Sequence, residues 1–258
     1  MGTVELSTLD ECGVLTLSAP MARNAWTRAM QREVASSIQQ LDADDSIRAI
    51  ILTGEGQQAF CAGQDLAEVA TFTVHDVDAW LAGFAHVYDC VLSTTKPVVA
   101  ALNGVAAGSG YQLALLCDSR VAHEDALIGQ PEVRSGIPSV TGLYLTWQSL
   151  GHSRTADLLL SGRMISGREA YAVGLVNHIC DADQVMTVAL EVANDMADCP
   201  PHAFSLTKQR IKAVLGPGLR DAFEAARELD RIAYGTGEPQ ATARRFLARH
   251  ASASGVDG

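Results

Sequence analysis

The amino-acid sequence predicts an α/β protein in which a largely parallel sheet is followed by a helical C-terminal part. Two apolar runs, at residues 49–52 and 97–102, indicate strands that are buried on both faces, as is typical of parallel sheets. Segments with helical spacing alternate with these strands over roughly the first half of the chain. From about residue 140 onward, most of the periodic segments are helical.

The N-terminal elements alternate between strands and helices. A short apolar run predicts a strand at 14–17, and Thr27 is a suitable N-cap for a helix that continues to about Leu41. The apolar stripe of that helix consists of Met30, Val34, Ile38 and Leu41. The buried strand 49–52 follows, and apolar spacing predicts the next helix at 77–92.

The middle of the chain repeats this alternation. The buried strand 97–102 leads into a loop of small residues, which opens into a helix that includes 113–116. A third strand is predicted at 119–122. Strands that alternate with helices indicate βαβ units, and therefore mainly parallel pairing.

The C-terminal part is mostly helical in pattern. Helices are predicted at 157–160, 166–173, 185–196, 203–215 and 219–232, and a last short strand at 177–179. Ser166 and Glu169 have the spacing of a capping box. We therefore divide the chain into a core at 1–195 and a helical C-terminal region at 196–258, with a frayed tail from residue 252.

The composition excludes several classes of protein. The chain has 258 residues, 48% hydrophobic and 19% charged, which predicts a globular protein with a large core. The net charge of −11 argues against a broad surface for nucleic acid or anionic membranes, but it allows a small pocket for one phosphorylated ligand. No apolar run approaches the roughly 18 residues of a membrane span. We expect a cytoplasmic location.

The cysteines do not predict a metal or disulfide site. Six cysteines are spaced too widely for a C-x-x-C pair, and His123 and His178 lie at no zinc-like spacing to them. Reduced, buried thiols are the simplest interpretation.

Two glycine-rich segments allow other interpretations. Residues 54–59 match G-x-G-x-x-A after a strand, which is the spacing of a dinucleotide-binding turn, but the helix that should follow would contain Gly63. Ser109 lies in a small-residue segment that opens a helix, so it is a candidate nucleophile of a serine hydrolase. However, Ala107 stands where the nucleophile-elbow pattern requires glycine.

Three longer segments occur together in a recognisable order. They are AFCAGQDL at 59–66, NGVAAGSGYQLALLCD at 103–118 and GQPEVRSGIPSVTG at 129–142. With PMARNA at 20–25 and AYAVGLVN at 170–177, these segments resemble the crotonase family, also called the enoyl-CoA hydratase/isomerase superfamily. The resemblance covers nearly the whole chain, and its strength lies in five motifs in register.

The resemblance implies a fold and a chemistry. The fold would be a ClpP/crotonase-like spiral of ββα units with a helical C-terminal region, assembled as a homotrimer or a dimer of trimers. The substrates would be acyl-CoA thioesters, with no metal and no cofactor, because coenzyme A is part of the substrate. The backbone amides of Ala62 and Ser109 would stabilise the negative charge on the thioester oxygen of an enolate.

Other positions take their roles from the same resemblance. Glu132 would be the catalytic acid/base, and Gln112 would lie beside it. The substrate-binding residues would be Arg23, Ala59, Gly63, Gln64, Asp65, Leu66, Gly108 and Arg249. Arg23 and Arg249 would approach the phosphates of coenzyme A, and Leu66 would line the acyl channel.

Gln112 departs from the pattern of the family. Hydratases of the family carry a glutamate at this position as well as at Glu132, and a pair of carboxylates holds and activates water better than one. One carboxylate suffices to move a double bond, so isomerisation is slightly preferred. Hydration remains an alternative, as do another thioester reaction and a non-catalytic acyl-CoA binder. Val140 argues against the subfamilies that use an additional aspartate there.

Overall fold

Two β-sheets form the centre of the molecule. The structure, a computed structural model, describes the backbone of residues 2–253 and the side chains of residues 2–249. The larger sheet has the order β1-β2-β3-β5-β7-β10, and all its pairs are parallel except β1 with β2. Its strands are β1 (Thr3–Leu9), β2 (Cys12–Ser18), β3 (Ala49–Gly54), β5 (Val98–Leu102), β7 (Ser119–His123) and β10 (His178–Cys180).

The smaller sheet consists of four short strands. They are β4 (Ala59–Cys61), β6 (Val105–Ala107), β8 (Leu127–Gly129) and β9 (Met164–Ser166), in the order β4-β6-β8-β9. The pairs β4–β6 and β6–β8 are parallel, and β8–β9 is antiparallel. Sequence analysis did not predict these strands individually, because three residues are too few to show a two-residue period.

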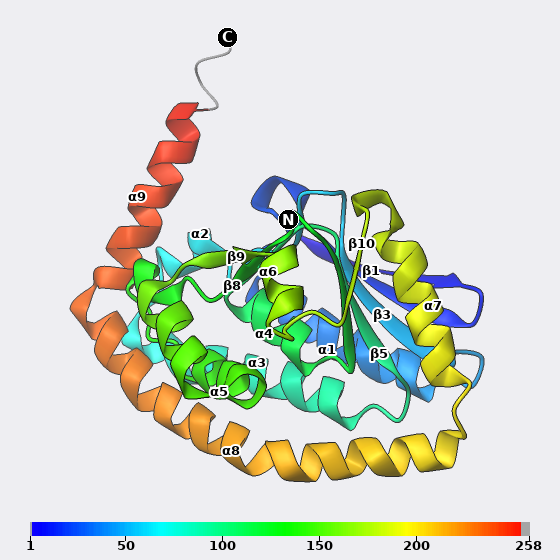
Figure 1. The fold of residues 1–258 in the computed structure, drawn as a ribbon. Coiled ribbons are helices and arrows are strands. Elements are labelled where there is room, and N and C mark those ends of the chain that lie inside the picture. Colours follow the sequence, from blue (N-terminus) through cyan, green and yellow to red (C-terminus); the bar gives the residue numbers. More distant parts are fainter. Residues whose placement is uncertain (1, 254–258) are drawn as a thin grey trace.

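The two sheets are built from a repeated ββα unit. The consecutive pairs β3–β4, β5–β6 and β7–β8 each place their first strand in the larger sheet and their second in the smaller one. A helix follows each pair: α2 (Leu66–Val69) with α3 (Val77–Ser93), α4 (Ser109–Leu116), and α5 (Thr141–Ser161). The expected spiral of ββα units with a helical C-terminal region is therefore confirmed (Figure 1).

Helices cover both faces of the larger sheet, which explains its continuous apolar strands. All six residues of β3 and all five of β5 are buried. On one face, Ile51 and Val99 pack with Ala189 of α7 (Val185–Ala197). On the other face, Ile50 and Leu52 join the main core with α1 (Arg28–Ala43) and α3. The interpretation of these strands as buried on both sides is confirmed.

Helix boundaries follow local capping chemistry. The Thr27 hydroxyl accepts a hydrogen bond from the Met30 amide, as its predicted N-cap role requires. Ser166 similarly accepts from the Glu169 amide at the start of α6 (Gly167–Ala172). The predicted helix at 157–160 is only the last part of α5, which bends at Gly151 (φ 69°).

The C-terminal region contains one long helix where two were predicted. α8 (Pro201–Thr236) continues through Pro217 and curves along one side of the molecule, and α9 (Glu238–Ala253) follows it (Figure 1). Next to Pro217, the helix packs closely against Tyr144. A Cβ on Gly218 would lie only 2.5 Å from the Tyr144 ring, so there is no room for a side chain there. The Tyr144 hydroxyl also donates to the Leu215 carbonyl (2.8 Å). Tertiary packing thus overcomes the helix-breaking tendency of this stretch.

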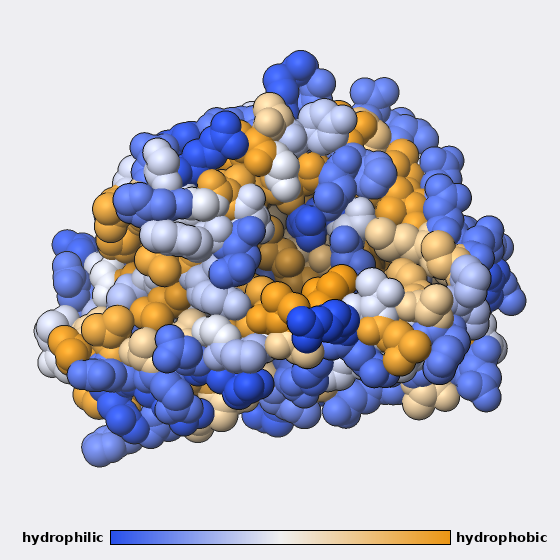
Figure 2. Space-filling view, turned by 60° about the horizontal axis from the view of Figure 1, so that its bottom comes forward, coloured by the Kyte–Doolittle hydropathy of each residue, from blue (hydrophilic) through white to orange (hydrophobic). Residues whose placement is uncertain are grey.

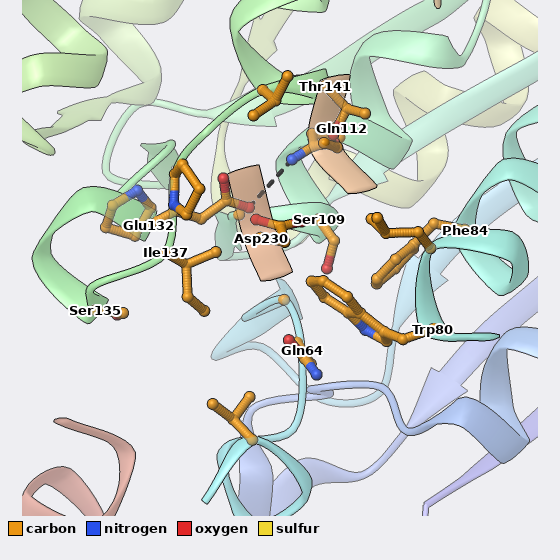
Figure 3. Close-up of a pocket in the computed structure, with 18 of the residues that line it drawn as sticks. Gln64, Trp80, Phe84, Ser109, Gln112, Glu132, Ser135, Ile137, Thr141 and Asp230 are labelled. Atoms are coloured by element: carbon orange, nitrogen blue, oxygen red, sulfur yellow. Dashed lines mark hydrogen bonds between the residues drawn. The ribbon is translucent and has the colours of Figure 1, made fainter. Parts of the chain in front are cut away.

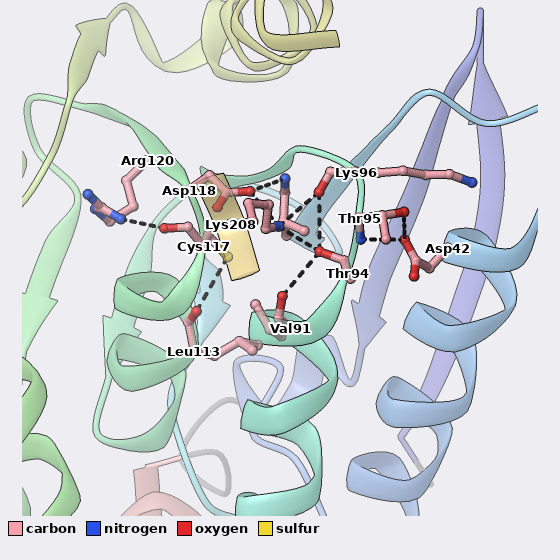
Figure 4. Close-up of polar contacts among 11 residues, drawn as sticks. Asp42, Val91, Thr94, Thr95, Lys96, Leu113, Cys117, Asp118, Arg120 and Lys208 are labelled. Atoms are coloured by element: carbon pink, nitrogen blue, oxygen red, sulfur yellow. Dashed lines mark hydrogen bonds and ion pairs between the residues drawn. The ribbon is translucent and has the colours of Figure 1, made fainter. Parts of the chain in front are cut away.

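A buried ion pair joins α8 to the sheet. Lys208 lies on α8 and is 6% exposed, and its ammonium group lies 2.8 Å from the Asp118 carboxylate (Figure 4). The same group donates to the Thr94 hydroxyl and the Lys96 carbonyl. Asp118 in turn accepts from the Val98 amide at the start of β5. This network fixes the N-terminal half of α8 to the end of the larger sheet.

The sequence predicts a frayed tail from residue 252. Residues 252 and 253 belong to α9, whereas 254–258 lie outside the described residues. Among the helices of residues 2–253, none is both long and apolar enough to span a bilayer.

Candidate active site

The smaller sheet brings three segments of the chain to one place. The strands β4, β6 and β8 are parallel neighbours, so the residues that follow them emerge at the same edge. Ala62–Leu66 follow β4, Gly108 and Ser109 follow β6, and Gln130–Glu132 follow β8. The three segments that resemble the crotonase family, far apart in sequence, therefore border one pocket.

Glu132 is a half-buried residue at the start of the short 3₁₀ helix Glu132–Ser135, and it lines the pocket. Burial raises the pKa of Glu132 from 4.5 to about 7, while the polar side chains of Ser139, Gln130 and Gln112 act in the opposite direction. A carboxyl with such a pKa is present in both protonation states near neutral pH, which suits a group that accepts and returns a proton.

Gln112 is held rigidly beside Glu132. It lies in α4, and its amide nitrogen donates to Glu132 Oε1 (3.1 Å), as drawn in Figure 3. Its carbonyl oxygen accepts from the Tyr88 hydroxyl (2.9 Å) and from the Thr141 hydroxyl (2.7 Å). Both donors orient the amide so that nitrogen faces Glu132, and Gln112 therefore positions the carboxylate without competing for its proton.

The amide of Ser109 faces the pocket from the N-terminus of α4. As the first residue of this helix, Ser109 has no intrahelical acceptor for its N–H, and the helix dipole adds partial positive charge. Glycine is required nearby at two positions. Gly63 has φ +94°, and a Cβ there would lie 2.8 Å from the Ala107 carbonyl and 3.5 Å from the Ser109 nitrogen. Gly108 has φ +55° and lies beside Glu132.

The amide of Ala62 differs from what the resemblance implies. Ala62 lines the pocket, but its N–H donates to the carbonyl of Arg23 (3.0 Å) and is not free to bind a substrate oxygen in this state. Arg23 and Asn24 both have positive φ, which turns the Arg23 carbonyl toward β4. Use of the Ala62 amide for an oxyanion therefore requires that the Arg23 carbonyl shares or releases it.

The rest of the pocket is largely apolar. Its empty volume is about 740 Å³, part of it open to solvent. Aromatic and aliphatic side chains come from α2, α3, the 132–140 loop and α8: Leu66, Val69, Trp80, Leu81, Phe84, Ile137, Val140 and Phe223. The space-filling view also shows hydrophobic residues gathered around a hollow in one face of the molecule (Figure 2). Such a pocket suits an acyl chain better than a charged ligand.

Most predicted site residues lie at this pocket, and four do not. Gly63, Gln64, Leu66 and Gly108 line it together with the four residues discussed above. Ala59 is buried in β4, where its carbonyl accepts from Asn24, and Asp65 caps α2 by accepting from the Ala67 amide. Arg23 and Arg249 are exposed and lie outside the pocket lining.

Neither alternative reading of the glycine-rich segments fits the geometry. Residues 59–61 form strand β4, whereas a dinucleotide-binding turn would open a helix there. The Ser109 hydroxyl accepts from Trp26 Nε1 (2.8 Å), and no histidine of the described residues lines the pocket to activate it. Likewise, no cluster of three potential metal ligands occurs among those residues.

Asp230 is an ionisable pocket residue that sequence analysis did not identify. It lies on α8, is 3% exposed, and lines the same pocket as Glu132 (Figure 3). Burial and the Glu132 charge raise the pKa of Asp230 to about 8. A signal existed, since Phe223, Ala226 and Asp230 have helical spacing, and an aspartate on such a stripe is unusual.

Comparisons with known proteins show the family to which the chain belongs. The sequence model of the family "Enoyl-CoA hydratase/isomerase" matches residues 10–249. A probable enoyl-CoA hydratase of Rhizobium meliloti (strain 1021) is 32% identical over 96% of this chain and 95% of its own. The probable enoyl-CoA hydratase EchA17 of Mycobacterium tuberculosis is 36% identical over 87% of this chain and 86% of its own.

Solved structures show the same architecture. An enoyl-CoA hydratase/isomerase from Mycobacterium paratuberculosis superposes with a TM-score of 0.85 at 24% identity, covering 94% of this chain and 97% of that one. An enoyl-CoA hydratase from Bacillus anthracis gives a TM-score of 0.77 at 29% identity, with 90% and 89% covered. The chain belongs to the enoyl-CoA hydratase/isomerase family. It is an acyl-CoA enzyme of the crotonase superfamily, as the five sequence motifs indicated.

Proposed function

We propose that this protein isomerises the double bond of enoyl-CoA thioesters, moving it from C3–C4 to C2–C3. The observation that carries the proposal is the pairing of one catalytic carboxylate, Glu132, with a neutral amide, Gln112, at a distance of 3.1 Å. A proton shift needs one base that can also act as an acid, whereas the addition of water benefits from a second carboxylate.

The reaction would proceed in two proton transfers. Glu132 removes a proton from C2, and the electron pair of that C–H bond moves into an enolate whose negative charge lies on the thioester oxygen. The Ser109 amide stabilises this oxygen, together with the Ala62 amide once the Arg23 carbonyl shares it. Loss of one such donor typically costs roughly 3–4 kcal/mol in the transition state. Glu132 then returns the proton at C4, so no further cofactor is consumed.

The remaining parts of the substrate would extend to both sides of this centre. The acyl chain occupies the apolar pocket beyond Leu66, and coenzyme A lies toward Arg23, which is exposed next to the Ala62 segment. Arg249 approaches the phosphates of coenzyme A in a neighbouring subunit. Gly63, Gln64 and Gly108 shape the wall, while Ala59 and Asp65 act indirectly by fixing β4 and α2.

We also propose that the protein assembles as a homotrimer or a dimer of trimers. Large apolar side chains of α8 are exposed in the single chain, including Ile211 at 52%, Val214 at 64% and Ile232 at 61%. Contact with other copies of the chain would bury them. Light scattering after gel filtration would measure the mass directly, and a monomer would contradict this part of the proposal.

Hydration is the second candidate function. Relatives of this chain are named probable enoyl-CoA hydratases. The Gln112 amide has a second N–H that could hold a water next to Glu132. Under this alternative, Glu132 activates the water alone and the reaction is slower than with two carboxylates.

One experiment separates these reactions. The protein is incubated in deuterated water with 3-enoyl-, 2-enoyl- and 3-hydroxyacyl-CoA, and the products are separated by liquid chromatography, which resolves the two enoyl isomers, and identified by mass spectrometry. Isomerisation predicts conversion of the 3-enoyl ester to the 2-enoyl ester, with loss of this activity in Glu132→Gln. Fast hydration of the 2-enoyl ester without isomerisation would refute the proposal in favour of the hydratase.

A further inference from the structure

Three polar side chains that line the acyl pocket have buried polar atoms without a hydrogen bond. Gln64, Trp80 and Asp230 line the pocket, and we call them the polar wall. Within residues 2–249, both amide atoms of Gln64, the indole nitrogen of Trp80 and Oδ1 of Asp230 are buried without a hydrogen bond. Buried polar groups are nearly always paired, so an unpaired cluster at a pocket indicates a ligand group.

The polar wall is one cluster rather than three scattered defects. Tyr234 lies next to all three residues. It follows Asp230 by four positions on α8, and its ring centroid lies 6.1 Å from that of Trp80. Burial and the neighbouring Asp230 raise the pKa of the Tyr234 hydroxyl, and the nearby Gln64 side chain acts in the opposite direction. Residues of three separate elements therefore converge beside the acyl pocket.

The wall offers both donors and acceptors, and it is neutral. Gln64 and Trp80 supply N–H donors, Gln64 supplies an amide oxygen, and Asp230 adds a carboxyl group. Burial and the Glu132 charge raise the pKa of Asp230 to about 8, which favours the protonated, neutral carboxyl near pH 7. No lysine, arginine or histidine in the described part of the chain lines the pocket, so an anionic group would be unfavourable there.

We propose that the acyl group of the natural substrate carries a hydroxyl, and that the polar wall binds it through Asp230, Gln64 and Trp80. A hydroxyl both donates and accepts, which matches the wall, whereas a plain alkyl chain leaves these groups buried and unpaired. The inference rests on the proposed function only in placing an acyl-CoA in this pocket. Asp230 is thus a specificity-determining residue, and Glu132 remains the base.

Binding of unreactive esters tests this inference. Octanoyl-CoA is compared by calorimetry with its 5-, 6-, 7- and 8-hydroxy derivatives and with octanedioyl-CoA. At least one hydroxy ester is expected to bind roughly ten- to a hundredfold more tightly than octanoyl-CoA, because it pairs groups that are otherwise left unsatisfied. Octanedioyl-CoA, which ends in a carboxylate, is expected to bind no more tightly than octanoyl-CoA.

Matched variants assign the preference to Asp230. Asp230→Leu is expected to abolish it by tightening octanoyl-CoA binding and weakening hydroxy-ester binding, whereas Asp230→Asn, which is also neutral and polar, retains most of it. Asp221→Leu, an exposed substitution on the same helix, leaves the preference unchanged. Thermal unfolding monitors the folding of each variant.

Two results would overturn the inference: no hydroxy ester binds better than octanoyl-CoA, or the preference survives in Asp230→Leu. A failure of the isomerase proposal would appear instead in the deuterium experiment, since these esters do not react.

Discussion

Replacement of Glu132 by glutamine is expected to lower activity and raise stability at the same time. The substitution preserves shape and leaves an oxygen that accepts from the Gln112 amide, but it removes the charge and the basic group. Without a general base, turnover should fall by roughly 10²–10⁴-fold or more. Such opposite changes in activity and stability are expected where a protein keeps a destabilising charged group because catalysis requires it.

The expected gain in stability follows from the pKa of Glu132. Burial raises this pKa from 4.5 to about 7, so the folded state disfavours the ionised form. A shift of one pKa unit corresponds to about 1.4 kcal/mol, so the ionised carboxylate costs the folded state on the order of 3 kcal/mol above pH 7. The wild type carries almost none of this cost well below pH 4.5; the cost grows between pH 4.5 and pH 7 and is constant above the folded pKa. Glutamine never carries it.

Urea unfolding at pH 5 and pH 8 measures this difference. The variant should exceed the wild type by about 1 kcal/mol or less at pH 5 and by on the order of 3 kcal/mol at pH 8. Glu228→Gln, an exposed substitution on α8, is the matched control and should change little at either pH. Equal stability of Glu132→Gln and wild type at pH 8 would refute the burial argument, and near-normal turnover would refute the assignment of the base.

Three further predictions concern the same site and its scaffold. In wild type, kcat/KM should rise about tenfold per pH unit below pH 7 and level off above it, because Glu132 must be ionised to accept a proton; a flat profile between pH 5 and 8 would contradict this. Gln112→Glu should increase hydration of crotonyl-CoA, followed as loss of enoyl absorbance, and an unchanged rate would argue against the missing carboxylate as the limit. Lys208→Met should destabilise the fold by about 3–5 kcal/mol in urea unfolding because the largely buried Asp118 carboxylate loses its counter-charge and keeps only the Val98 amide as a partner, whereas Lys212→Met, at an exposed pair, should cost about 0–1 kcal/mol; similar losses would show that the buried pair has no special role.

Local patterns predicted those elements whose residues interact mainly with near neighbours in the chain. The apolar runs of β3 and β5 and the Thr27 and Ser166 caps could be recognised because each depends on composition or on spacing over a few residues. The continuous helix α8 could not, since Pro217 ordinarily interrupts a helix and only the contact with Tyr144 supports it there. The division of the chain at residue 195 stays a prediction.

Recognition of the site depended on a different kind of information. The order of five motifs identified the family and pointed to Glu132, Gln112 and Ser109, all of which line one pocket. Their catalytic roles stay predictions. The Ala62 amide was expected to be free, and it bonds to the Arg23 carbonyl instead, because two consecutive residues with positive φ turn that carbonyl toward it.

By itself the sequence determined the class of protein, the buried strands and the change from a carboxylate to an amide at Gln112. The tertiary structure alone decided that Asp230, 98 positions beyond Glu132, faces the same pocket and leaves its carboxyl unpaired there. The physical reason is that the burial of a side chain and its distance to other charges depend on how helices and strands pack together. The helical spacing of the apolar residues around Asp230 indicates that it faces the core, but only the packing of α8 over the pocket determines which groups surround it.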